Sequence, residues 1–277
     1  MRVRGVFPHA GSMQFISSEL VEAAARSDRT VPWIRDEPLI MGVDVARFGD
    51  DASIIRFRQG RNARGIPPIK LRGVDTMELA ARIADESALH RVDAIFIDGA
   101  GVGGGVVDRC RQIGLNVTEV QFGAKSDRAP VGQDRAIGYA NKRAEIWGAM
   151  RDWLPGGAID NDPELIADLT GVEYGYVLRD GRDAIQLERK EDMKRRGLAS
   201  PDDGDALALT FAYPVLASSV ARSRRPGRLY RSSYNPYALR PDEMIGGVGS
   251  SSGDRTAAEW SRGRTLELPF ANDDKGW

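Results

Sequence analysis

The sequence contains very few of the side chains that form disulfides or bind transition metals. Its 277 residues include one cysteine, Cys110, and two histidines, His9 and His90. A single cysteine excludes an intramolecular disulfide and favours a reducing compartment. So few sulfur and imidazole ligands also exclude a zinc site of the usual type. A metal ion in this protein would therefore be a hard cation held by carboxylate oxygens.

Long apolar runs and a strong excess of one charge are also missing. No stretch of 18 apolar residues is present, and the chain does not start with the basic segment and apolar core of a signal peptide. The formal net charge is −1, so overall charge does not draw the protein to nucleic acid. We expect a cytoplasmic protein without a membrane partner, which contacts phosphate through local patches or bound cations.

Composition divides the chain into three parts. Residues 1–37 mix polar residues with a short apolar piece and a helix-like run over 18–25, and we expect a connector. Residues 38–217 carry nearly all the helix and strand patterns and should form the main domain. Residues 218–277 are rich in Ser, Gly, Arg and Pro. We expect this tail to be disordered, because it has little apolar surface to bury.

The main domain begins with three strands and continues with alternating helices and strands. Apolar segments at 39–46 and 53–58, linked by a Gly- and Asp-rich turn, predict a hairpin, and a third strand is expected near 69–74. The later pattern predicts helices at 76–89 (capped by Thr76), 103–113, 135–153 and from 201, strands at 94–98 and 116–121, and a hairpin at 173–188. This predicts an α/β fold. Its mixed five-stranded sheet has antiparallel strands before parallel ones, is flanked by helices, and is accompanied by an extra β-hairpin.

Acidic residues stand at three places in this pattern where a carboxylate needs a partner. Asp44 lies within the first strand, Asp98 ends the central apolar strand, and Asp202 and Asp205 share one face of the last helix. Each alone is also explained as a solvent-facing strand residue, a turn former or a helix start. Together they would meet at one sheet edge, where their repulsion calls for divalent cations. We predict two Mg²⁺ or Mn²⁺ ions, the arrangement that supports in-line phosphoryl displacement.

The glycines after Asp98 allow a second interpretation. The run GAGVGG matches the GxGxxG turn of dinucleotide-binding proteins, and Glu119 follows Gly99 at about the spacing of a ribose-binding acid. However, three strands precede this turn, and Asp98 would face the pyrophosphate. A Rossmann-type nucleotide-binding protein also leaves Asp44 and Asp205 unexplained, so it is the less favoured alternative.

Four segments of the chain together resemble a known family. GVDVARFGDDAS, IDGAGVGGGVVD, NKRAEIW and GLASPDDGDALALT are similar to the nuclease domain of the large terminase subunits of tailed bacteriophages, over about residues 1–216. The resemblance implies a ribonuclease H-like fold and metal-dependent endonuclease cleavage of double-stranded DNA during genome packaging. It places the metal-binding acids at Asp44, Asp98 and Asp205, with Asp202 as a plausible fourth. The host would be an infected or lysogenic bacterial cell.

Four basic residues are candidate DNA contacts, and the resemblance also implies protein partners. Lys142, Arg143, Lys190 and Lys194 are candidates to contact DNA phosphates, although a solvated charged surface is the simpler explanation for most of them. The family also implies a portal, a small terminase subunit or an ATPase motor as partners. The chain has no G-x-x-x-x-G-K-[ST] loop, so we expect an excised domain, a split gene or a decayed prophage copy.

Two further alternatives keep a similar arrangement of strands. An actin-like ATPase also begins with an Asp on a strand before a hairpin, but it requires a second, repeated domain that this sequence lacks. A catalytically silent module would retain the ribonuclease H-like fold and bind only DNA or capsid components. The intact acids at 44, 98 and 205 argue against this loss of activity.

Overall fold

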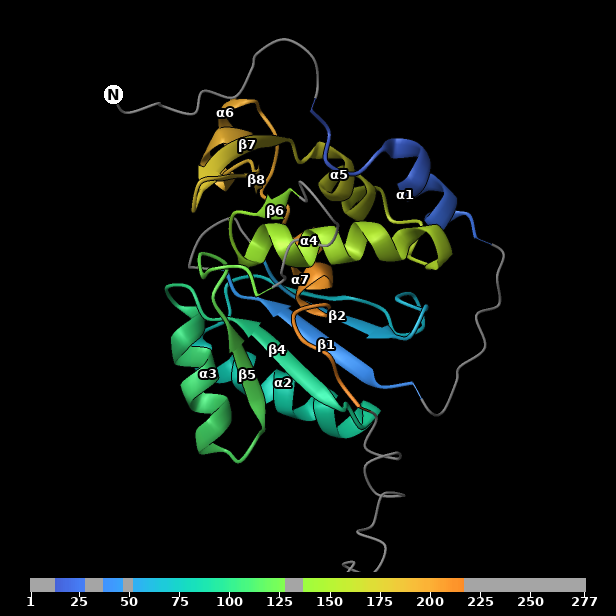
Figure 1. Cartoon of the computed structure of the whole chain (residues 1–277). Helices are drawn as coiled ribbons and strands as arrows, with labels where there is room; N and C mark the ends of the chain where they lie inside the picture. Colours follow the sequence, from blue (N-terminus) through green and yellow to red (C-terminus); the bar gives the residue numbers. More distant parts are fainter. Residues whose placement is uncertain (1–12, 28–36, 47–51, 128–136, 217–277) are drawn as a thin grey trace, which may run out of the picture. The chain divides into compact units, whose positions relative to one another are not determined.

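The computed structural model of the chain describes residues 13–27, 37–46, 52–127 and 137–216 (Figure 1). The expected tail at 218–277, most of the turn at 48–52 and part of the expected connector lie outside these residues. None of the helices in the described ranges is long and apolar enough to cross a membrane.

A five-stranded mixed sheet carries two of the predicted metal-binding acids, Asp44 and Asp98. Its strand order is β3-β2-β1-β4-β5. The strands are β1 (Leu39–Asp44), β2 (Ser53–Gln59), β3 (Ile69–Leu71), β4 (Ala94–Asp98) and β5 (Val117–Val120). β2 is antiparallel to β1 and β3, whereas β4 is parallel to β1 and β5. The predicted order of antiparallel strands before parallel ones is confirmed.

Helices α2 (Thr76–His90) and α3 (Gly103–Gln112) pack on one face of this sheet. Their buried side chains, such as Ile83 and Val107, join Met41 and Ile97 of the strands in one apolar cluster. The prediction of Thr76 as the N-cap of α2 is wrong by one residue. Asp75 is the cap, and its carboxylate accepts hydrogen bonds from two backbone N–H groups of the first turn.

The opposite face is covered by α7 (Asp202–Leu209), behind which lie α4 (Lys142–Trp153), α5 (Pro163–Gly171) and α1 (Ser18–Ala25). α7 lies directly on β1, and a Cβ at Gly42 would collide with the carbonyl of Ala206. Glycine at 42 is therefore what allows this close approach. Val21 of α1 belongs to the same apolar cluster as Trp147 of α4, so α1 packs on the helices beside it.

A second sheet has the order β6-β8-β7, with β6 (Gly138–Tyr139), β7 (Tyr174–Arg179) and β8 (Arg182–Leu187). The predicted second hairpin is confirmed, and its turn residues Asp180 and Gly181 both have positive φ, as a type I′ turn requires. The helix expected from 135 begins later, because β6 pairs with β8 and Asn141 caps α4. The remaining short helices are η1 (Leu154–Gly156) and α6 (Lys190–Arg195).

Candidate active site

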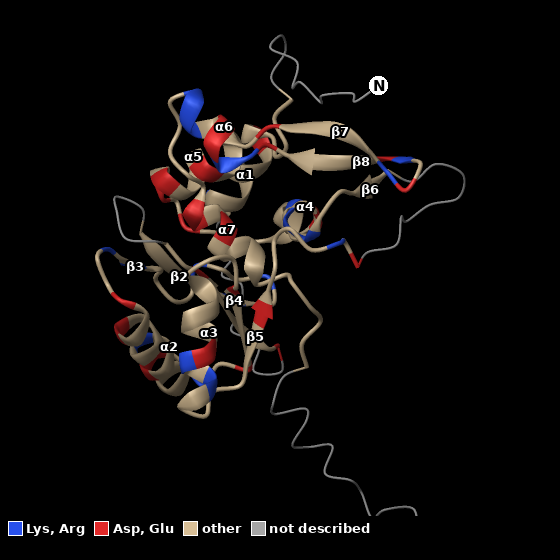
Figure 2. Ribbon diagram, turned by 90° about the vertical axis from the view of Figure 1, so that its left-hand side faces the viewer, with Lys and Arg blue, Asp and Glu red and all other residues tan. Residues whose placement is uncertain are grey.

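The ends of three elements bring four carboxylates together. β1 ends at Asp44, β4 ends at Asp98, and the first turn of α7 carries Asp202 and Asp205. β1 and β4 are parallel neighbours in register, with Val43 opposite Ile97, so the two strand acids are adjacent at one edge of the sheet. α7 reaches the same edge because it packs on β1. The first turn of α7 can be located in Figure 2.

The ammonium group of Lys190 lies among three of these acids. Its Nζ is 3.2 Å from Asp44 Oδ2, 2.9 Å from Asp202 Oδ1 and 3.1 Å from Asp205 Oδ2. Burial lowers the pKa of this lysine, but the three carboxylates outweigh it, so the net pKa is well above the ordinary value. Lys190, whose side chain is 32% exposed, therefore acts as the internal cation of the acid cluster. Its expected contact with DNA phosphates stays a prediction.

Burial also controls the strand acids. It raises the pKa of Asp44 well above its usual value, and the charge of Lys190 only partly offsets this. For Asp98, burial raises the pKa to about 6, while a hydrogen bond of 3.1 Å from the backbone N–H of Ala100 to Oδ1 works in the opposite direction. These shifts mean that positive charge added nearby would favour the ionised form of both acids. The electrostatics of this sheet edge therefore favour binding of a cation.

Asp205 differs from the strand acids because α4 holds it in the ionised form. Its Oδ1 accepts hydrogen bonds from Arg143 Nε at 2.9 Å and from Trp147 Nε1 at 2.7 Å. Burial opposes ionisation, but the charges of Arg143 and Lys190 together with these bonds keep the pKa of Asp205 below its ordinary value. Asp205 Oδ2 is buried and has no hydrogen-bond partner of good geometry among the described residues.

The first turn of α4 gives its two basic residues interior partners. Lys142 is only 2% exposed, and its Nζ is 2.9 Å from Asp127 Oδ2 and 2.8 Å from Glu145 Oε1. Arg143 is bound to Asp205 and donates through Nη1 to the carbonyl of Glu188 at 2.9 Å. Neither residue lies on the surface where DNA phosphates were expected to meet them. Lys194 is exposed on α6, and its contact with DNA stays a prediction.

The glycine-rich turn after β4 serves close packing. A Cβ at Gly103 would collide with the carbonyl of Asp98, so this glycine allows the start of α3 to fold back on the end of β4. The Asp98 carboxylate itself accepts the backbone N–H of Ala100 within the turn. A dinucleotide-binding turn instead offers such N–H groups to a pyrophosphate. The GxGxxG match is therefore explained without a nucleotide.

The donor set can be tested against the predicted metal ions. As they stand, no three potential ligands in the described part of the chain are arranged to hold a metal ion. The Lys190 ammonium lies among the oxygens that would have to converge. All the available donors are carboxylate oxygens, which suits Mg²⁺ or Mn²⁺, and one of them, Asp205 Oδ2, is buried without a hydrogen bond. The chemistry of these residues therefore fits a hard divalent cation.

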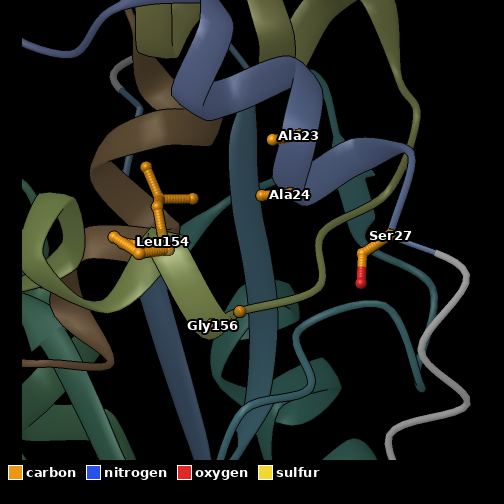
Figure 3. A pocket seen from close by; sticks show the side chains of 7 residues that line it. Ala23, Ala24, Ser27, Leu154 and Gly156 are labelled. Carbon is orange, nitrogen blue, oxygen red and sulfur yellow. The ribbon is translucent and has the colours of Figure 1, made fainter.

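Two cavities lie outside the acid cluster. One, of about 510 Å³, is formed between α1 and η1 (Figure 3), and none of the described residues that line it ionises. The other, of about 620 Å³, lies between the loop around Lys125 and the turn of the β7–β8 hairpin, where Arg179 and Arg182 are exposed. Neither is lined by the four acids.

Trp147 was not singled out from the sequence as a functional-site residue. Its ring is fully buried in the core, yet its indole N–H binds Asp205. The available signal was the spacing of Arg143 and Trp147, four residues apart in NKRAEIW, which puts a cation and an N–H donor on one helix face.

Comparison with known proteins bears on the fold. No protein-family model and no curated protein matches the sequence. The structure resembles solved structures of the nuclease domain of the large terminase subunit of bacteriophage Sf6. A point mutant with calcium and one with manganese and β-thujaplicinol each have a TM-score of 0.62 and 21% identity, and the domain without mutation has 0.60 and 22%. Each match covers 73% of this chain and all of the Sf6 chain. The predicted ribonuclease H-like fold of terminase nucleases is thereby confirmed.

Proposed function

We propose that this chain is the nuclease module of a phage DNA-packaging terminase, a metal-dependent endonuclease that cleaves double-stranded DNA. The observation that carries the proposal is the group of four carboxylates at the ends of β1 and β4 and the start of α7, three of them within 3.2 Å of the Lys190 ammonium. The fold is shared with Sf6 structures that contain manganese or calcium, which supports a divalent cation here too.

Asp44, Asp98, Asp202 and Asp205 are the residues that would hold two Mg²⁺ or Mn²⁺ ions. When bound, such ions supply positive charge at the attacking and leaving oxygens of a phosphodiester. The protein contributes the arrangement of the acids. Asp205 is ionised and oriented before any ligand arrives, since α4 holds its Oδ1. Asp44 and Asp98, whose pKa values are raised by burial, lose protons more readily when positive charge is near.

Lys190 connects the cluster with its surroundings. Its ammonium lies about 3 Å from the oxygens that metal ions would use, so it must withdraw when those ions bind. It is the first residue of α6, a helix of six residues whose later basic side chain Lys194 is exposed. We infer that the displaced Lys190 and Lys194 then contact backbone phosphates, which positions DNA without reading its sequence. The portal, the small terminase subunit or a separate ATPase motor would be the packaging partners.

One observation favours a second candidate function. The acid cluster is already neutralised in part by Lys190, so a module that has lost catalysis could keep the fold and bind only DNA or capsid components. This alternative predicts that divalent ions do not displace the lysine and that no phosphodiester bond is cut.

A plasmid-nicking assay separates the two functions. Supercoiled plasmid is incubated with wild type, Asp44→Asn or Asp108→Asn in EDTA, Mg²⁺ or Mn²⁺. The control Asp108 is an exposed acid on α3, away from the cluster. We expect metal-dependent open-circular and linear DNA from wild type and Asp108→Asn, but not from Asp44→Asn. Cleavage by Asp44→Asn at the wild-type rate, or none by folded wild type with metal, would contradict the proposal.

A further inference from the structure

Asp205 and the α4 side chains that hold it form an arrangement that neither burial nor charge alone explains. Two strong donors, Arg143 Nε and Trp147 Nε1, converge on the same oxygen, Oδ1. The other oxygen, Oδ2, is buried and receives no hydrogen bond of good geometry from the described residues; its charged neighbour is the Lys190 ammonium at 3.1 Å. A buried carboxylate oxygen without a hydrogen bond is costly, so the presence of one among four acids calls for an explanation.

The two donors are rigidly placed relative to Asp205. The Trp147 ring packs against Gly204, the residue before Asp205, where an added Cβ would lie 2.9 Å from the ring. Trp147 is fully buried, so its indole N–H cannot swing away to water. These contacts restrict the rotation of the Asp205 carboxylate, and they determine which of its oxygens is free.

Arg143 also links Asp205 with the chain that carries the internal cation. Its Nη1 donates to the carbonyl of Glu188 at 2.9 Å, two residues before Lys190. Its Nη2 is buried without a hydrogen-bond partner among the described residues. Nε and Nη2 lie on the same edge of the planar guanidinium, which could bind both oxygens of a carboxylate. Here that edge holds only Oδ1, and Oδ2 lies 3.1 Å from Lys190 Nζ.

We propose that Trp147 and Arg143 are positioning residues that keep Asp205 Oδ2 free for a divalent cation by holding Oδ1. Neither side chain contacts the ion. They act through Asp205, in the way that outer partners orient metal ligands elsewhere. The inference rests on the proposed function, since it assumes that cations bind at the four acids. It assigns a role to two residues of NKRAEIW whose types alone suggest other roles: Trp147 as a core residue and Arg143 as a surface residue.

Mn²⁺ affinity measured by electron paramagnetic resonance, without DNA, tests the proposal. The variants are Trp147→Phe and the matched control Trp153→Phe on the same helix. Trp153 Nε1 donates to the carbonyl of Gly60 at 2.9 Å, so the control loses the same kind of hydrogen bond outside the acid cluster. We expect Trp147→Phe to weaken Mn²⁺ binding about tenfold, and Trp153→Phe to leave it unchanged.

Arg143→Lys provides a second variant. It keeps the positive charge but cannot bind Asp205 and the Glu188 carbonyl as a planar fork, so we expect weaker Mn²⁺ binding here as well. Wild-type affinity in both Trp147→Phe and Arg143→Lys would overturn the positioning role, as would equal weakening in the two tryptophan variants. Failure of folded wild type to bind Mn²⁺ at all would overturn the proposed function, and this inference with it.

Discussion

Two buried arginine–aspartate pairs flank α7, and they differ in how completely they are satisfied. Arg56 engages both oxygens of Asp203 through Nε and Nη2, and its Nη1 lies 2.6 Å from Asp160 Oδ2. Arg143 holds a single oxygen of Asp205 and leaves its own Nη2 without a hydrogen bond among the described residues. We call the first pair closed, because both carboxylate oxygens are bound, and the second pair open, because one oxygen is left. Asp203 and Asp205 are only two residues apart.

The surroundings of the two pairs have the same charges but different burial. Each group contains four carboxylates and two cations. Around Arg56 and Lys70 the acids are Asp160, Asp162, Glu164 and Asp203. Around Arg143 and Lys190 the acids are Asp44, Asp98, Asp202 and Asp205.

Solvent exposure determines how far the excess negative charge of each group is screened. The Glu164 side chain is 71% exposed and those of Asp160 and Asp162 are 25% exposed, so water screens the excess negative charge around Arg56. At the open pair, Asp205 is fully buried and Asp44 is 3% exposed. The comparison teaches that the number of charges does not identify a site. Unscreened negative charge with an unsatisfied oxygen does, because only this combination requires an added cation.

The largest stability effect is expected at the closed pair. Arg56→Met would leave the buried Asp203 carboxylate without its bidentate partner, which should lower the free energy of unfolding by about 3–5 kcal/mol. Lys70→Met serves as the comparison, because two of its three acid partners, Asp162 and Glu164, are themselves open to solvent, so it should contribute less than Arg56. Urea unfolding measures both. Equal effects would show that the closed pair is not the structural anchor described here.

Removing the internal cation from the open group should have a smaller effect that metal reverses. In EDTA, Lys190→Ala leaves its acid neighbours less neutralised and should cost about 2 kcal/mol of stability. Mn²⁺ no longer competes with an ammonium, so its addition should raise the melting temperature of Lys190→Ala more than that of wild type. Lys194→Ala, one turn further along α6, should respond to Mn²⁺ as wild type does, because the ammonium that lies among the acids belongs to Lys190. A Mn²⁺ response in Lys190→Ala that is no larger than in wild type would contradict this competition.

The smallest effect concerns pH on the closed side of α7. Asp168 Oδ2 accepts hydrogen bonds from the backbone N–H groups of Asp203 and Gly204, and burial raises the pKa of Asp168 to about 7. The unfolded value is about 3.9, so between these values the native state binds the proton more tightly. The stability from this group is fully present below about pH 4 and is lost as pH rises through about 7.

Asp168→Asn removes this titration. Wild type should therefore lose about 1 kcal/mol more stability than Asp168→Asn between about pH 5 and pH 6. Melting temperatures of the two proteins across that range measure the difference. Parallel curves would mean that Asp168 does not titrate between its folded and unfolded values as described.

The sequence predicted those helices and strands that are marked by the apolar pattern of their own residues. The strand Ala94–Asp98 and the helix Ser18–Ala25 were predicted with their observed bounds, because apolar runs and periodicity mark them directly. The start of α4 was not, because Gly138–Tyr139 pairs with β8, a contact that local pattern does not contain. α5 was also missed, since only Leu165 and Leu169 of its nine residues are buried.

The candidate site divides in the same way. The positions of Asp98 at a strand end and Asp205 at a helix start follow from element order, whereas Asp44, expected inside a strand over 39–46, is the last residue of β1. The placement of the cations does not, because the partner of Arg143 lies 62 residues away. From sequence alone, a Lys or Arg is expected to be exposed. Only the fold shows that Lys142, Arg143 and Lys190 form ion pairs with carboxylates.

Metal-dependent cleavage of supercoiled DNA by Asp205→Asn and Asp160→Asn, side by side, tests the central claim most directly. Each substitution neutralises one carboxylate bound to an arginine, Asp205 at the open pair and Asp160 at the closed one. With both variants shown to be folded, Asp205→Asn should lose cleavage by roughly a hundredfold or more and Asp160→Asn should cut like wild type. Equal cleavage by the two variants would contradict the claim that the open group is the catalytic one.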